Sequence, residues 1–217
     1  HIAPEVGEEM QRGALLGLFP FQIVSDLNKG GAQQYTWSQV YYRWNLEMEK
    51  MYKTSSNVQA SARTFLQSST EFDEIYHQEQ PFALGFLCRH ARKLCKLVDV
   101  QEAYIDSTYR TNSSRLELFA VLGSFLGTGF PIAYLLLEPG AGQNGEECTT
   151  QRKTSIRGFL AAVRRELLAF KPLFFFTDKD IGQISAISSV YGITPSICLW
   201  HMKRALKRKV RELQSRG

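Results

Sequence analysis

Residues 118–137 have the sequence LFAVLGSFLGTGFPIAYLLL, twenty positions without a charged side chain. A run of this length is sufficient to span a bilayer as a helix. Its centre, however, holds Gly127, Gly129 and Pro131, which mark a turn. On either side lies an apolar run of strand length that is rich in Val, Ile, Phe and Tyr. We therefore expect a buried β-hairpin, from 116–126 to 131–138, and no membrane span.

Outward from this hairpin, the sequence predicts alternating strands and helices. Residues 100–106 alternate apolar Ala103 and Ile105 with polar neighbours, as a half-buried strand does. The later elements are expected as a helix at 154–170, a strand at 173–177, a helix at 181–190 capped by Asp180, a strand at 197–199 and a helix from His201. The first three strands form an antiparallel meander, and the later strands enter in parallel through helix crossovers. This order predicts an α/β fold with a mixed sheet, an arrangement that resembles the ribonuclease H-like fold.

The N-terminal part, residues 1–78, is expected to be a small helical segment. Helix signals occur at residues 4–10, 18–27 and 36–44. A Gly-containing break at 28–31 and an N-cap at Thr36 suggest a helix-turn-helix, although a plain helical bundle fits the same pattern. Residues 1–75 carry six Lys and Arg against nine acidic residues, a poor charge balance for contacting DNA.

Composition places the chain among ordinary globular proteins. Its 217 residues are 44% apolar and 22% charged, which suits one domain, or one domain plus a small one, and excludes collagen, long disordered tails and disulfide miniproteins. The four cysteines form no C-x-x-C pair, so reduced thiols are expected. Because the chain starts at His1 and ends in a polar helical pattern, we expect it to belong to a longer polypeptide.

Two carboxylates follow core strands. Asp106 ends the strand at 100–106 and Asp178 ends the strand at 173–177, 72 residues later. If these strands are neighbours, both side chains lie at one edge of the sheet, where they can bind Mg²⁺ or Mn²⁺. Two such ions can stabilise the attacking and leaving oxygens of a phosphodiester displacement. From spacing alone, an Asp at a strand end is more often a solvated turn residue or a helix cap than a metal ligand, and Asp180 is assigned as a cap.

Three motifs occur in order: Asp106-Ser107-Thr108-Tyr109-Arg110-Thr111-Asn112, Thr177-Asp178-Lys179-Asp180 and Cys198-Leu199-Trp200-His201. Together they resemble the Mutator-like (MULE) transposase domain, with its D-x-T-Y-[KR]-T-N, T-D-x-[DE] and C-x-W-H patterns. The transposase-derived far-red-response transcription factors share these sequence motifs. The resemblance covers residues 82–217, and the preceding helical segment is similar to the family's pre-catalytic region.

The resemblance implies a DDE-type transposase that cleaves and transfers DNA strands with two divalent metals. Asp106 and Asp178 would be the first two metal-binding acids. The family's third acid, a Glu, follows a helical insertion well downstream of the C-x-W-H motif, so we expect it outside this chain and the domain to be C-terminally incomplete and inactive by itself. Glu212 is not assigned this role. The alternative is a domesticated regulatory module that binds DNA without cutting it.

Cys198 and His201 have the spacing of zinc ligands on a helical turn. Two ligands do not complete a tetrahedral site, so the others would come from His90, Cys95 or a part of the polypeptide beyond this chain. A buried Cys beside a hydrogen-bonded His is the other interpretation.

The positive charge is concentrated in the last helix. Residues 201–217 hold seven Lys and Arg against one Glu, whereas the first 200 residues hold 19 basic and 20 acidic side chains within the overall net charge of +5. The helix is expected to bury Met202, Leu206, Val210 and Leu213. Its opposite face suits phosphate contact or a nuclear localisation signal, or is simply solvated. The residues expected to bind DNA are Arg110, Lys203, Arg204, Lys207, Arg208 and Arg211. We therefore expect the protein to be nuclear and to have DNA as its partner. A homo-oligomer is compatible with this expectation.

Overall fold

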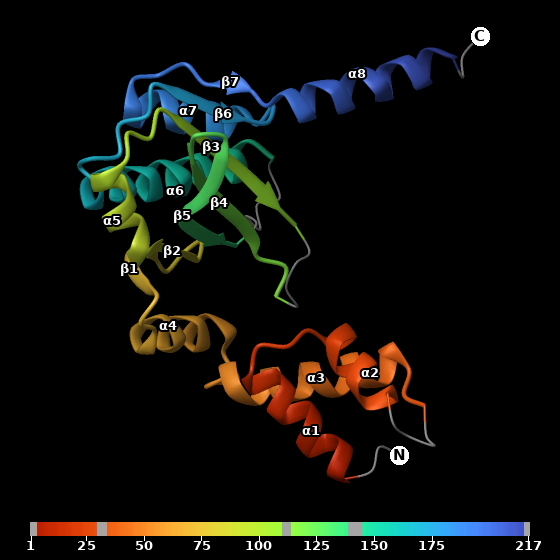
Figure 1. Ribbon diagram of the computed structural model, residues 1–217. Coiled ribbons are helices and arrows are strands. Elements are labelled where there is room, and N and C mark those ends of the chain that lie inside the picture. The colour runs from red at the N-terminus through yellow and green to blue at the C-terminus, as the bar shows by residue number, and fades with distance from the viewer. Residues whose placement is uncertain (1–3, 30–33, 110–113, 139–144, 215–217) are drawn as a thin grey trace. The chain divides into compact units, whose positions relative to one another are not determined.

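The computed structural model describes residues 4–29, 34–109, 114–138 and 145–214, which contain eight helices and seven strands (Figure 1). The chain divides into two compact units, residues 1–65 and 66–217. Each unit has its own hydrophobic core. No helix in the described ranges combines the length and the hydropathy that a membrane span requires.

The first unit is helical, as predicted. Its helices are α1 (Pro4–Leu15), α2 (Pro20–Asn28), α3 (Trp37–Tyr52) and α4 (Val58–Ser68), the last of which crosses the unit boundary. Thr36 caps α3: its hydroxyl accepts a hydrogen bond from the Gln39 N–H, and its own N–H donates to the Gln39 side chain. Eight residues separate α2 from α3, more than the three or four of a typical helix-turn-helix. DNA reading by this unit stays a prediction.

The second unit is built on one mixed sheet in the order β1-β2-β5-β4-β3-β6-β7. The strands are β1 (Phe72–Gln78), β2 (Ala83–Cys88), β3 (Glu102–Thr108), β4 (Glu117–Phe125), β5 (Thr128–Leu137), β6 (Phe174–Thr177) and β7 (Ser196–Ile197). Strands β3, β4 and β5 form the expected antiparallel meander, β6 pairs in parallel with β3, and β7 pairs in parallel with β6. The part β5-β4-β3-β6-β7 is the predicted ribonuclease H-like arrangement.

The sequence LFAVLGSFLGTGFPIAYLLL forms the β4–β5 hairpin. Leu126 and Gly127 have φ angles of 50° and 77°, so both central residues of the two-residue turn are left-handed. This turn matches the right-handed twist of the strands that it joins. Val121, Ile132 and Leu135 are fully buried, which explains the absence of charge in this stretch.

The described part of the second unit has four helices, α5 (Arg89–Leu97), α6 (Gly145–Glu166), α7 (Ile181–Tyr191) and α8 (Leu199–Gln214). Phe159, Leu160 and Val163 of α6 are fully buried in the core that the strands share. Helix α6 corresponds to the helix predicted at 154–170, but it both begins and ends earlier in the sequence than predicted. Helix α8 extends away from the sheet (Figure 1).

Strand β1 differs from the sequence-based expectation. Residues 72–78 were expected to continue the helical segment, but they form β1, which pairs antiparallel with β2. Ile75 is the only buried residue of β1. An edge strand with one buried side chain gives no clear apolar alternation, which is why its sequence does not predict it.

The register of β3 and β6 decides where the two acids lie. The paired residues are Glu102 with Phe174, Ala103 with Phe175 and Tyr104 with Phe176, each 72 residues apart. Asp106 and Asp178 are separated by the same 72 residues, so continuing the register places them opposite each other just where β6 ends. Parallel strands in register point equivalent side chains to the same side. The pairing therefore directs both carboxylates to one place.

Candidate metal and nucleic-acid site

Asp106, Asp178 and His201 come together at the end of β3 and β6. One ligand atom from each, two carboxylate oxygens and an imidazole nitrogen, lie within 4.8 Å of one another. Asp106 is on β3, Asp178 directly follows β6, and His201 is in the first turn of α8. The expected convergence of the two carboxylates is therefore present, and the structure adds a histidine that the sequence had assigned to a different site.

Local hydrogen bonds orient each acid. The Ser107 N–H donates to Asp106 Oδ1 at 2.9 Å, and the Asp180 N–H donates to Asp178 Oδ1 at 2.8 Å. His201 Nε2 lies 3.9 Å from Asp106 Oδ1. These bonds leave the remaining carboxylate oxygens available to a further ligand.

Arg152, Glu117 and Asp180 form a cluster of charged side chains, which we call the arginine clamp, and Asp180 is close to Asp178 in the sequence. Arg152 of α6 makes two hydrogen bonds to Glu117 of β4, from Nε at 2.9 Å and from Nη2 at 2.7 Å, while its Nη1 lies 2.6 Å from Asp180 Oδ2. The Glu117 side chain is 1% exposed, so its charge is balanced within the protein. The other Asp180 oxygen caps α7 by accepting from the Gln183 N–H, as the sequence predicts.

Charge and burial shift two pKa values in this clamp. Burial disfavours the Arg152 cation, but hydrogen bonds and the charges of Glu117 and Asp180 outweigh it and raise the pKa of Arg152. The pKa of Tyr109 rises to about 12, because burial and a hydrogen bond to Glu117 both favour the protonated phenol. Tyr109 therefore belongs to the clamp at neutral pH as a hydrogen-bond donor.

Residues 103–205 match the family model of the MULE transposase domain. This segment is similar to the MULE transposase domain. The matched range contains Asp106, Asp178 and the complete C-x-W-H motif. No curated protein and no solved structure gives a significant match to the chain. Similarity to the far-red-response factors stays a prediction.

The C-x-W-H motif of this segment does not form a three-ligand zinc cluster among the residues that the structure describes. His201 joins the acids, and its Nδ1 is buried without a hydrogen-bond partner. Cys198 is a free, half-buried cysteine whose N–H donates to the Thr177 carbonyl. Of the other suggested ligands, His90 is exposed and Cys95 is buried in the core, both on α5. Zinc binding stays a prediction.

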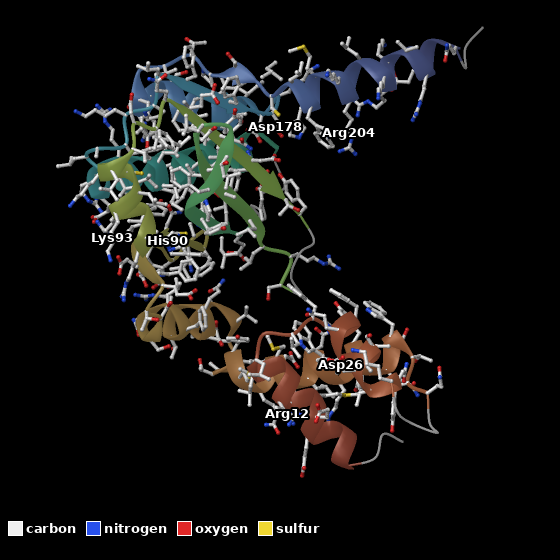
Figure 2. All side chains as sticks on the ribbon, viewed as in Figure 1. Arg12, Asp26, His90, Lys93, Asp178 and Arg204 are labelled. Atoms are coloured by element: carbon white, nitrogen blue, oxygen red, sulfur yellow. The ribbon has the colours of Figure 1, made fainter. Side chains whose placement is uncertain are left out.

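A basic groove leads from the acids along α8. It has a volume of about 680 Å³ and is lined by Asp178, Trp200 and His201 together with Lys179, Lys203, Arg204, Lys207, Arg208 and Arg211. Figure 2 shows Asp178 near the start of α8, with Arg204 on the helix. Five of the six residues predicted to bind DNA therefore share one groove with a predicted metal ligand. The sixth, Arg110, lies outside the described residues.

The apolar stripe of α8 contradicts the sequence-based expectation. Met202, Leu206 and Val210 were expected to be buried, but they are 41%, 61% and 52% exposed. The side chain of Leu213 lies outside the described part. Because α8 extends away from the sheet, these residues have no core to enter (Figure 1).

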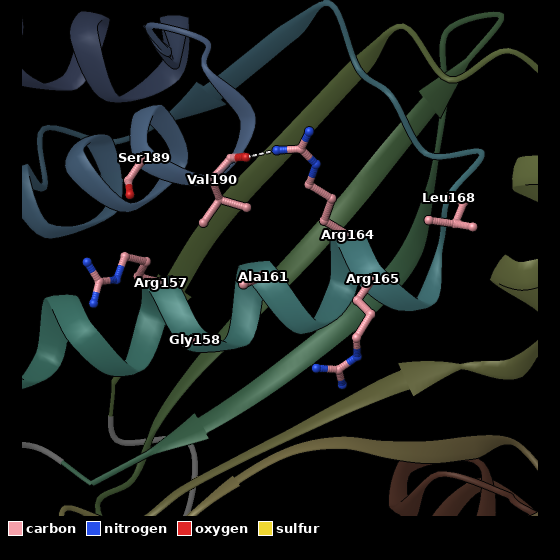
Figure 3. A pocket seen from close by; sticks show the side chains of 8 residues that line it. All are labelled: Arg157, Gly158, Ala161, Arg164, Arg165, Leu168, Ser189 and Val190. Atoms are coloured by element: carbon pink, nitrogen blue, oxygen red, sulfur yellow. Dashed lines mark hydrogen bonds between the residues drawn. The ribbon is translucent and has the colours of Figure 1, made fainter.

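A second hollow, on α6 and α7, is lined by Arg157, Arg164 and Arg165 (Figure 3). Arg164 donates to the Val190 carbonyl and lies over the Tyr191 ring, and Arg165 donates to Glu166 and to the Ile75 carbonyl. Two of the three arginines thus already hold the fold together, so this hollow is a weaker candidate than the α8 groove.

Sequence reasoning missed Arg152 and Glu117. Glu117 is buried and Arg152 is half-buried, and the ion pair between them forms only when α6 docks on the sheet. Glu117 offered the one available signal, since it opens an otherwise uncharged strand.

Proposed function

We propose that the transposase-related function indicated by the MULE match is metal-dependent cleavage and transfer of DNA strands, with Asp106 and Asp178 as metal ligands. The observation that carries the proposal is that the three ligand atoms lie within 4.8 Å of one another and that two of the three residues, Asp178 and His201, line a basic groove.

The donor set fits a hard divalent cation. Two carboxylates suit Mg²⁺ or Mn²⁺, and an imidazole favours Mn²⁺ or Zn²⁺ over Mg²⁺. Two ligands of one ion at about 2.1 Å are about 3.0 Å apart in cis positions and about 4.2 Å apart in trans positions, so a pair at the 4.8 Å limit would have to close by about 0.6–1.8 Å. When bound, the metal would supply positive charge to the attacking and leaving oxygens of the phosphodiester.

The other roles in the proposed reaction belong to residues of the chain. Asp106 and Asp178 would hold the ion, and the Asp180 N–H fixes the Asp178 carboxylate. The α8 cations bind the phosphates on one side of the scissile bond. In the reaction, the oxygen of water or of a DNA hydroxyl bonds to phosphorus and loses its proton to solvent, while the bond from phosphorus to the leaving oxygen breaks.

Metal binding is the primary test, because the third acid is expected elsewhere in the polypeptide. Mn²⁺ titration followed by electron paramagnetic resonance should show one or two sites in the wild-type chain. Asp106→Asn and Asp178→Asn should each weaken binding at least about tenfold, whereas Glu79→Gln, at an exposed acid, should not. Wild-type binding by both Asn variants would refute the metal assignment.

The second candidate is a DNA-binding regulatory module without catalysis. Among the described residues, the only cluster of three metal-binding side chains contains two carboxylates and no third acid. In this case, the chain would bind DNA but not Mn²⁺, and neutralising Asp106 or Asp178 would leave DNA binding unchanged or improve it. The same α8 cations underlie our proposal of nuclear localisation, which a fluorescent fusion with Lys207, Arg208 and Lys209 replaced by Ala would test.

A further inference from the structure

Trp200 is an unusually exposed side chain beside the candidate metal site. It is 58% exposed, although its indole is the largest apolar group in the first turn of α8. It belongs to neither hydrophobic core and lines the same groove as Asp178 and His201. Packing therefore does not explain why a tryptophan occupies this position.

The indole ring is held in place by its own helix. The Arg204 guanidinium carbon lies 5.2 Å from the ring centroid, in cation–π contact. The His201 ring meets the indole edge-to-face, with centroids 4.8 Å apart and an interplanar angle of 87°. Trp200 is therefore an ordered aromatic surface directly next to a residue that faces both acids.

The surroundings of Trp200 define what it can bind. Lys203, Arg204 and Lys207 in the groove attract a phosphate chain, while the indole offers an apolar face among these cations. A nucleic acid strand presents the same combination of charged phosphates and flat bases. Inside a duplex both faces of each base are covered by neighbouring bases, so away from the duplex ends an indole can stack only on a base that is unpaired.

We propose that Trp200 is a stacking site for an unpaired nucleobase beside the phosphate that the acids act on. This inference rests on the proposed function in one respect, that the groove takes DNA. The role is one of substrate positioning: the base on Trp200 fixes the register of the strand, and the α8 cations hold its phosphates.

The test compares strands that differ only in their bases. Binding of fluorescein-labelled dT12 and of a 12-nucleotide abasic strand is measured by fluorescence anisotropy on the full chain, together with a 12-base-pair duplex. We expect Trp200→Ala to weaken dT12 binding about 5- to 100-fold and duplex binding by less than about twofold. Wild type should bind the abasic strand about as weakly as Trp200→Ala binds dT12, and Trp200→Phe should retain most of the affinity.

Trp37 provides a matched control. It belongs to the other unit, is 52% exposed and stacks on Tyr41, so Trp37→Ala removes an exposed indole that is not among the residues lining the groove. Equal binding of dT12 and the abasic strand by wild type would overturn the stacking site and leave DNA binding intact. No binding of any of the three ligands would overturn the proposed function itself. The abasic comparison uses wild type alone, so it decides the question even if Trp200→Ala does not fold.

Discussion

Arg152 and Asp180 form an ion pair, with 2.6 Å between Nη1 and Oδ2, that ties α6 to the residue that caps α7. Asp180 also donates its N–H to Asp178, so the same residue connects the buried clamp to the candidate metal ligand. The position of Asp178 is therefore set from inside the fold, by residues that do not themselves reach the groove.

Removing Arg152 should cost more stability than removing the whole Arg152–Glu117 pair. Arg152→Met leaves the Glu117 carboxylate buried and without its bidentate partner, which we expect to lower the free energy of unfolding by about 3–5 kcal/mol. Adding Glu117→Gln removes the unpaired charge and should recover part of this loss. Urea denaturation of both variants checks the expectation. A double variant less stable than Arg152→Met would contradict the role of the buried charge.

Gly182 offers a test of how tightly the clamp is packed. A Cβ at this position would lie 2.9 Å from Asp180 Oδ1 and 3.2 Å from Arg152 Nη1. Gly182→Ala should therefore destabilise the second unit by about 1–3 kcal/mol. Gly7 of α1 is the matched control, because its Cβ would make an ordinary 3.5 Å contact with Arg43 and Ala is favoured over Gly in a helix by about 0.5–1 kcal/mol. Equal thermal shifts for the two variants would contradict this account.

The α8 groove should control the salt dependence of DNA binding. Replacing Lys203, Lys207 and Arg211 with Ala removes up to three phosphate contacts, so the slope of log K against log salt should become shallower by about 2–3. Replacing exposed Lys93 and Lys96 of α5 changes the net charge without touching the groove. If the slope of log K against log salt became as shallow in this α5 variant as in the α8 variant, general attraction between opposite charges would explain DNA binding better than the groove does.

Cys88 and Cys95 should resist alkylation in the folded protein. Burial raises the pKa of both thiols from 9 to about 11, and the charge of Glu71 adds to the effect at Cys88. At pH 8 this lowers the thiolate fraction about 100-fold, and the reactive form is the thiolate. Iodoacetamide labelling followed by mass spectrometry should show both sites protected in buffer and modified in urea. Half-buried Cys198 is the internal comparison and should label first.

The same two thiols predict a direction for stability against pH. Because their pKa values are raised in the folded state, their contribution is fully present below pH 9 and is lost as the pH rises toward about 11. Replacing Cys95 with Ala should flatten this alkaline loss. An unchanged alkaline profile would show that these thiols do not titrate on unfolding.

The order of the elements was predictable because it rests on local signals. The uncharged stretch around Gly127 predicts the β4–β5 hairpin, and the 72-residue separation of Asp106 and Asp178 turned out to equal the β3–β6 register. The spacing predicted only that the two carboxylates could lie close together. The family resemblance added the expectation that they are metal-binding acids.

The parts that were missed depend on tertiary packing. The Arg152 clamp joins residues 35 and 28 positions apart through the docking of α6, and no local pattern encodes that docking. The direction of His201 depends on the rotation of α8 about its axis. The C-x-W-H spacing permits a ligand shared with Cys198, but the helix turns the imidazole toward the carboxylates instead.

The three-ligand cluster has a consequence for folding. Asp106, Asp178 and His201 span 95 residues of chain and meet only after β3 has paired with β6 and α8 has started. The unfolded polypeptide offers these donors one at a time, so it has little affinity for an ion that the native state would chelate. Any cation that fits this cluster should therefore stabilise the native state, and it should shift the folding equilibrium toward the native chain as its concentration rises.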